Sequence, residues 1–211
     1  MQQRLVCQLT AEQYVSQRFW ERASLPPCPM HPEGGCGFCR HTPYERKSTP
    51  GAKIARGYCR LGHVTVSLIP DCLASRLPAP LAQVEREVRR VEEAGGSVAA
   101  AAAQMHPTAL DVDHVQGAER RLRRRHLGVS AALRAIAGLM PDVFAGHPPT
   151  LEGFGAVLGT SGVLVALREV AAPHLANLPP PLGFGPRPLP RERRARQLQH
   201  GAGADPPAPA V

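Results

Sequence analysis

A chain of 211 residues, 43% of them hydrophobic, is long enough for one or two small folded domains, and 4% aromatics argue against a large aromatic core. Its 25 lysines and arginines outnumber 17 aspartates and glutamates, so the net charge of +8 favours an anionic partner such as nucleic acid. A GC-rich genome would enrich arginine in the same way. Because no run of about eighteen apolar residues exists, and residues 1–9 lack a signal-peptide core, we expect a cytoplasmic protein without a membrane span.

The N-terminal segment, residues 1–24, is predicted to carry one short helix over residues 10–23. Thr10 is a suitable N-cap, and Gln13 follows three residues later, as a capping box requires. Apolar residues of this helix, Phe19 among them, are expected to pack on the segment that follows. That segment alone would bury little apolar surface.

Residues 25–72 are predicted to form a zinc ribbon, because cysteines and histidines gather there in short pairs. The pairs leave two or three residues between their members: Cys28 with His31, Cys36 with Cys39, and Cys59 with His63. A turn of that length lets both side chains reach one ion, and zinc takes four nitrogen or sulfur ligands in a tetrahedron. Disulfides are the alternative, but in a reducing compartment clustered cysteines favour a metal.

A β-hairpin and a third strand are expected around these pairs. Residues 44–47 and 54–58 are strand-like and are separated by the turn signal Thr49-Pro50-Gly51. Residues 64–69 are rich in β-branched side chains, and Pro70 ends them.

The spacing of the pairs leaves the ligand set open. Nineteen residues separate the pair Cys36 and Cys39 from the pair Cys59 and His63, within the range of about 15–20 that is usual for such sites. Cys28 and His31 would close a loop of twenty-seven residues, which is compatible because loop closure costs grow slowly with length.

Residues 20–80 resemble the zinc-ribbon proteins of unknown function that are found around bacterial insertion sequences and transposases, and residues 80–180 resemble them loosely. The resemblance rests on Cys28-Pro29-Met30-His31, Gly34-Gly35-Cys36, Arg40-His41, Tyr44-Glu45-Arg46, Tyr58-Cys59, His63 and Leu68-Ile69-Pro70-Asp71-Cys72-Leu73. It implies a Zn²⁺ site in which Cys28 and His31 form the first turn and Cys59 and His63 the second. Cys36 is the alternative to His31.

A helical domain is predicted over residues 78–176. A helix from Leu81 with apolar residues at helical spacing, a stop at Gly95-Gly96 and a second helix capped by Ser97 resemble the start of a helix-turn-helix. The third helix, from near residue 116, carries the candidate DNA-binding residues Arg120, Arg121, Arg123, Arg124 and Arg125. The alternative is a helical bundle with a solvated basic face.

The rest of the chain is expected to continue as helices and then to end in a tail. Gly128 is predicted to break the third helix and Ser130 to cap the next one. Thr150 can cap a further helix over residues 151–158, and residues 163–175 read as a last apolar helix. From residue 177 to 211 the proline- and arginine-rich composition predicts a disordered tail.

Catalytic motifs are missing from the sequence: it has no phosphate-binding loop, no nucleophile elbow and no carboxylates on predicted buried strands. Cys7 or Cys72 could act as a nucleophile, although neither has an organised histidine partner in sequence. We therefore expect an α+β protein that is a non-enzymatic zinc-binding protein, binds DNA and is linked to a mobile element. The alternative is a protein-interaction module that docks on a transposase or a transcription partner.

Overall fold

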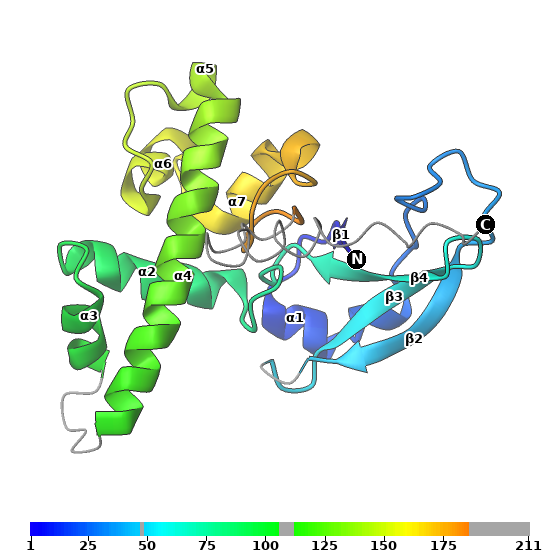
Figure 1. The fold of residues 1–211 in the computed structure, drawn as a ribbon, viewed down its shortest axis with the longest axis horizontal. Coiled ribbons are helices and arrows are strands. Elements are labelled where there is room, and N and C mark those ends of the chain that lie inside the picture. Colours follow the sequence, from blue (N-terminus) through cyan, green and yellow to red (C-terminus); the bar gives the residue numbers. More distant parts are fainter. Residues whose placement is uncertain (47–48, 106–111, 186–211) are drawn as a thin grey trace, which may run out of the picture.

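The structure is a computed structural model that describes residues 1–46, 49–105 and 112–185. It is an α+β protein with a four-stranded sheet at one end and helices α2 to α7 at the other (Figure 1). The strand order is β1-β4-β3-β2. The predicted fold class is confirmed.

The sheet is built from three antiparallel strands and one parallel strand. The strands β2 (Cys39–Glu45), β3 (Lys53–Cys59) and β4 (Val64–Pro70) form the predicted hairpin and third strand, with an irregularity between His41 and Tyr44. The predicted first strand, 44–47, therefore begins five residues earlier than expected. Sequence reasoning missed β1 (Gln2–Leu5), which pairs in parallel with β4.

The predicted N-terminal helix is shorter than expected. The helix α1 (Ala11–Ser16) begins at the Thr10 capping box, which is confirmed. A 3₁₀ turn, η1 (Phe19–Glu21), follows after Arg18 adopts a left-handed conformation with φ of 47°. Tyr14 and Trp20 are the buried aromatics of this segment, and they pack with the sheet core.

The helical part contains six α-helices among the residues that the structure describes. They are α2 (Leu81–Glu93), α3 (Val98–Met105), α4 (Val112–Leu139), α5 (Pro141–Phe144), α6 (Leu151–Leu158) and α7 (Val163–Val170), followed by the 3₁₀ turn η2 (Ala172–His174). The predicted caps at Ser97 and Thr150 are confirmed, because their hydroxyls accept hydrogen bonds from the backbone amides of Ala100 and Gly153.

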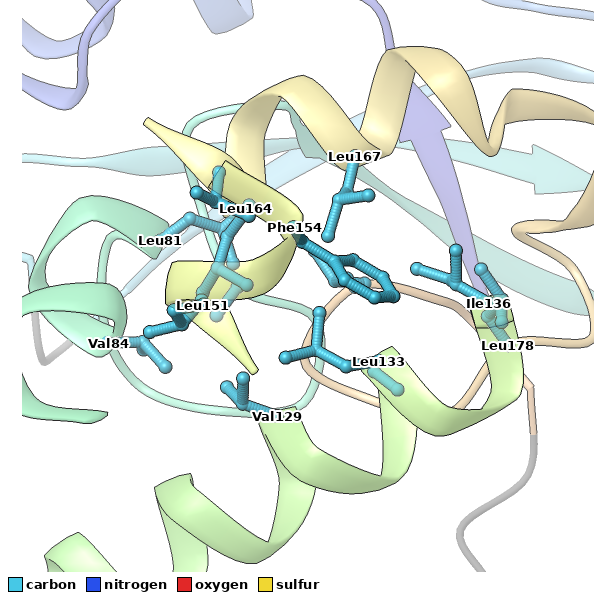
Figure 2. Packing of buried hydrophobic residues seen from close by; sticks show 14 of the residues in the cluster. Leu81, Val84, Val129, Leu133, Ile136, Leu151, Phe154, Leu164, Leu167 and Leu178 are labelled. Atoms are coloured by element: carbon cyan, nitrogen blue, oxygen red, sulfur yellow. The ribbon is translucent and has the colours of Figure 1, made fainter. Parts of the chain in front are cut away.

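A single apolar core joins α2, α4, α6 and α7 (Figure 2). Phe154 of α6 lies among aliphatic side chains of the neighbouring helices, and Phe144 stacks on it with ring centroids 4.1 Å apart. The labelled residues of this core are Leu81, Val84, Val129, Leu133, Ile136, Leu151, Phe154, Leu164, Leu167 and Leu178.

The prediction that Gly128 breaks the third helix and that Ser130 caps the next one is wrong. Helix α4 runs through Gly128, so Ser130 lies inside it and caps nothing. An interior glycine costs a helix only about 1 kcal/mol, and the packing of the α4 residues Val129, Leu133 and Ile136 into the helical core outweighs that cost.

The predicted start of the disordered tail at residue 177 is also wrong. Leu178 and Leu182 are 1% and 0% exposed and belong to the helical core. The backbone carbonyl of Pro181 accepts a hydrogen bond from the Ser75 amide at 2.9 Å. The remainder of the predicted tail, residues 186–211, lies outside the described residues.

Candidate metal centre

Four ligand-type side chains converge at the end of the sheet that carries Cys59. The ligand atoms of Cys28, His31, Cys36 and Cys59 all lie within 4.8 Å of one another, so the group could hold a metal ion. His31 Nδ1 stands 3.8 Å from Cys28 Sγ and 3.4 Å from Cys59 Sγ. Bonds of about 2.3 Å to sulfur and 2.0–2.1 Å to nitrogen give tetrahedral edges of about 3.5–3.8 Å. These two separations already approach that geometry.

Tight turns bring the four residues together. The His31 amide donates to the Cys28 carbonyl at 3.2 Å, which closes the first turn, and Gly34 then donates to the His31 carbonyl at 3.0 Å. Gly34 and Gly35 have φ of 88° and 75°, a conformation that side chains rarely adopt, and they return the chain to Cys36.

The strand β3 delivers the fourth residue, Cys59, at its last position. The Gly62 amide donates to Cys59 Sγ at 3.2 Å, and the Leu61 amide donates to the Cys36 carbonyl at 3.3 Å. A Cβ on Gly62 would stand 2.7 Å from the Met30 side chain, so the two ligand loops are in close contact.

The site is buried and favours ionised sulfur at one position. Cys28, Cys36 and Cys59 are 3%, 5% and 0% exposed. Burial raises the pKa of Cys28, but hydrogen bonds from His31 and from backbone amides outweigh it and lower that pKa to about 6. Burial raises the pKa of Cys36, and the sulfurs of Cys28 and Cys59 raise it further.

The predicted ligand His63 lies outside this cluster. It is exposed, has φ of 49°, and its Nδ1 is 3.1 Å from the Tyr58 hydroxyl. The structure brings Cys36 together with Cys28, His31 and Cys59, whereas the sequence offered Cys36 only as the alternative to His31. Cys39 also lies apart, with its Sγ 3.9 Å from the Tyr58 carbonyl. The sequence signal that pointed to Cys36 is the pair Gly34 and Gly35, because they permit the turn that brings the chain back to the site.

Three soft thiols and one imidazole would supply all four ligands of a tetrahedral ion. A site of this kind is closed, with no open position for water or substrate, and closed sites are structural. Thiolates also select zinc-like ions over magnesium or calcium. The donor set therefore fits a structural metal site.

The predicted DNA-binding arginines lie along α4 but do not share one environment. Arg120, Arg121, Arg123 and Arg124 are exposed. Arg125 is 5% exposed, and its Nη1 is 2.6 Å from Glu87 Oε1 on α2, so its assignment to a DNA-binding surface is corrected.

Two more of these arginines have acidic partners. Arg121 Nε lies 3.6 Å from Glu87 Oε2, and Arg123 pairs with Glu119 at 2.5 Å. A cavity of about 400 Å³ opens between Leu77-Pro78 and α4, and Arg120, Arg121, Arg124 and Arg125 line it with Gly117.

Comparison with protein-family models, with curated proteins and with solved structures finds no match for this chain. The resemblance of residues 20–80 to proteins of mobile elements therefore stays a prediction. Within the described ranges no single helix is both long and apolar enough to cross a membrane, and α6 and α7 meet that test only as a pair bent by 62°.

Proposed function

We propose that this chain is a non-enzymatic zinc-binding protein in which Cys28, His31, Cys36 and Cys59 hold one structural zinc ion. The observation that carries the proposal is the convergence of three thiols and one imidazole within 4.8 Å. Zinc would fasten the Cys28–Cys36 loop to the end of β3, because its ligands come from both. Zinc binding of this kind contributes directly to folding free energy.

The test is the zinc content of the reduced, purified chain. We expect one zinc per chain, and loss of that zinc when Cys36 or Cys59 is replaced by alanine. His63→Ala and Cys39→Ala are the matched controls, since both residues are nearby in sequence and lie outside the cluster; they should retain the metal. A wild-type chain that is folded and metal-free in reducing buffer would refute the proposal, and zinc loss in His63→Ala with retention in Cys36→Ala would restore the ligand set expected from sequence.

We further propose that the protein binds DNA through the exposed arginines of α4, in the mobile-element setting that the resemblance implies. The cavity beside Leu77 and Pro78 supports this, because the exposed residues Arg120, Arg121 and Arg124 line a space large enough for a phosphate. Arg120 and Arg124 carry the proposal, since they are exposed and lie one helical turn apart.

Salt dependence tests the DNA proposal. Replacing Arg120 and Arg124 by glutamine removes two phosphate contacts, so the slope of log affinity against log salt should fall by about 1.8. Arg134→Gln is the control, because Arg134 is exposed on the same helix about 15 Å further along the axis. Equal slopes in wild type, the double variant and the control would contradict this assignment.

The second candidate is a protein-interaction module that docks on a transposase or transcription partner. It is favoured by the pairing of Arg121, Arg123 and Arg125 with acidic residues, which reduces the positive charge that α4 offers to phosphate. Absence of any salt-dependent DNA binding by the wild-type chain would support this candidate over the first.

A further inference from the structure

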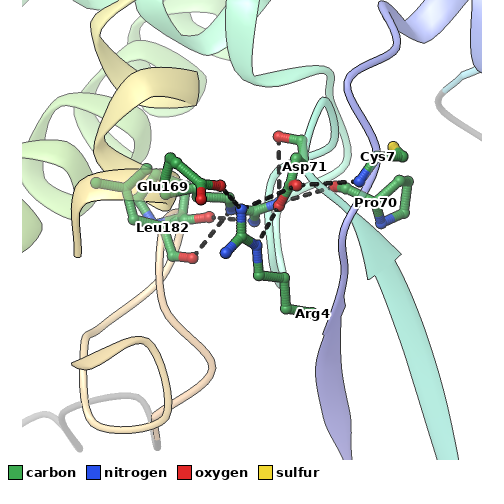
Figure 3. A network of polar contacts seen from close by, with 8 residues as sticks. Arg4, Cys7, Pro70, Asp71, Glu169 and Leu182 are labelled. Atoms are coloured by element: carbon green, nitrogen blue, oxygen red, sulfur yellow. Dashed lines mark hydrogen bonds and ion pairs between the residues drawn. The ribbon is translucent and has the colours of Figure 1, made fainter. Parts of the chain in front are cut away.

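The parallel pairing of β1 with β4 brings two further cysteines side by side, at a place remote in sequence from the metal ligands. Leu5 is paired with Pro70, so two residues further along each segment stand Cys7 and Cys72. The Cys7 amide donates to the Asp71 side chain, at Oδ2, at 3.1 Å, so the segment after β1 lies beside the segment after β4 (Figure 3). Neighbouring strands lie about 4.8 Å apart, and disulfide-bonded cysteines have Cα atoms about 4.4–6.8 Å apart.

The two thiols also contact each other and share one cavity. Both side chains belong to the apolar cluster of the sheet, and the interaction with Cys72 is the largest influence on the pKa of Cys7. Both line a cavity of about 660 Å³ between β1, α1, α2 and α7. Cys7 and Cys72 are only 7% and 6% exposed, yet this cavity gives a small solute a route to them.

The surroundings of the pair shift the pKa values of the two thiols in opposite directions. The hydrogen bond from Cys72 outweighs burial and lowers the pKa of Cys7 to about 6, with help from backbone hydrogen bonds. The same bond and burial raise the pKa of Cys72. Charged residues also line the cavity: Arg4, Glu12, Asp71, Arg86 and Glu169. The lowered pKa favours the thiolate of Cys7 at neutral pH, and the thiolate is the form of cysteine that attacks an oxidant.

We propose that Cys7 and Cys72 form a peroxide-reactive dithiol in which Cys7 is oxidised first and Cys72 closes a disulfide. In the first step the Cys7 thiolate attacks hydrogen peroxide, an S–O bond forms, the O–O bond breaks, and hydroxide leaves and takes up a proton as water. In the second step Cys72 loses its proton and attacks the sulfenic acid. An S–S bond forms, the S–O bond breaks, and a second water leaves. Two thiols lose two electrons, and one peroxide is reduced to two waters.

The disulfide would fasten β1 to the end of β4 covalently. At present this junction is held by polar contacts. Arg4 Nε contacts Asp71 Oδ1 at 2.7 Å, and Arg4 Nη2 contacts Glu169 of α7 at 2.5 Å (Figure 3). The proposal does not depend on the zinc site, because neither cysteine belongs to that cluster.

Peptide mapping of the zinc-loaded full chain tests the proposal. Trypsin places Cys7 alone in peptide 5–18 and Cys72 alone in peptide 61–76. After exposure to hydrogen peroxide and alkylation of the remaining thiols, we expect these two peptides to be linked and to separate on reduction. In Cys72→Ser, a sulfenic-acid trap such as dimedone should label peptide 5–18. In Cys7→Ser, peptide 61–76 should remain reduced.

Zinc content and circular dichroism establish that each variant remains folded. The wild-type result decides the proposal on its own. If both peptides stay reduced while peroxide oxidises Cys28, Cys36, Cys39 or Cys59, the proposal fails. It fails equally if Cys72 is oxidised as fast in Cys7→Ser as in the wild type, because Cys7 would then not be the first sulfur attacked.

Discussion

At the residue scale, Arg168 is the largest side chain that is fully buried among the described residues. Its guanidinium donates to four backbone carbonyls: Pro70 at 2.8 Å, Leu182 and Pro181 at 3.2 Å, and Asp71 at 3.3 Å. Burial lowers the pKa of Arg168 to about 10, which still leaves it charged at neutral pH. Arg168 therefore ties the segment after η2 to the end of β4.

Replacing Arg168 by alanine should lower the free energy of unfolding by about 3–5 kcal/mol, because it leaves buried carbonyls without donors. Arg168→Lys should recover little, since a single ammonium cannot reach four carbonyls in the geometry of a guanidinium. Urea unfolding measures both. Arg134→Ala, at an exposed position, should change the value by less than about 0.5 kcal/mol. A loss below 1 kcal/mol in Arg168→Ala would contradict the role given to this residue.

The lowered pKa of Cys28 predicts how the zinc affinity of the site changes with pH. Above about pH 6 the Cys28 thiol is already ionised, so a metal displaces no proton from it. Below that pH a proton occupies the sulfur and competes, so this thiol alone should weaken zinc binding by about tenfold for each further pH unit. Competition with a chelator of known affinity between pH 5 and 8 should show the added slope below about pH 6. An unchanged slope across that range would contradict the expected ionisation.

Sequence reasoning recovered three of the four clustered residues, because Cys28, His31 and Cys59 belong to short turns that a sequence displays directly. It placed His63 in the fourth position and offered Cys36 only as the alternative to His31, whereas Cys36 lies in the cluster and His63 does not. This difference depends on where His63 points after Cys59, and its left-handed backbone turns it toward Tyr58. A conformation of this kind is set by the turn as a whole and has no signal in residue spacing.

At the element scale, the predictable helices are those with a regular apolar stripe. Leu81, Val84, Val88 and Val91 are buried as their spacing predicts. By contrast, β1 has no alternating pattern, and its place depends on a partner strand more than sixty residues away. The predicted break at Gly128 was wrong because the penalty for a helical glycine is local, while the packing that outweighs it comes from other helices.

The segment 178–185 was missed for a related reason. Its prolines and glycines predict an irregular chain, and the chain is indeed irregular, yet Leu178 and Leu182 are buried in the helical core. Composition distinguishes regular from irregular backbone better than it distinguishes packed from unpacked backbone. Leu178 and Leu182, together with the carbonyls that accept hydrogen bonds from Arg168, pack this irregular segment against the core.

A pair of truncations tests this segment. A chain that ends at residue 177 loses Leu178, Leu182 and two carbonyl partners of Arg168. Each buried leucine is worth about 2–5 kcal/mol. We therefore expect a loss of at least about 4 kcal/mol, visible as a large drop in the urea midpoint. A chain that ends at residue 185 keeps these contacts and should unfold like the full chain. Equal stability of the two truncated chains would contradict the packing of residues 178–185.

At the scale of the whole molecule, the apolar cores of the sheet and of the helices meet at Phe184, which packs against both. The Arg168 guanidinium carbon lies 5.5 Å from the centre of the Phe184 ring and reinforces the junction. The metal cluster is attached at a different place. Its three cysteines pack with Phe38, which also packs against the sheet core. None of the four clustered residues belongs to the helical core.

This arrangement predicts that removing the metal loosens one end of the protein first. Structural zinc in small domains contributes about 10–16 kcal/mol of apparent binding free energy, so its loss should leave the ligand loops without a stable conformation. Amide hydrogen exchange after chelation should increase strongly over residues 25–38 and 59–64. Amides of α2, α4 and α7 should stay protected, because their side chains pack in a core that holds no ligand. Adding zinc should restore the exchange pattern of both ligand loops. A rise of similar size in α4 and α7 would mean that the metal stabilises the entire chain as one cooperative unit, and would contradict the separation of the metal cluster from the helical core.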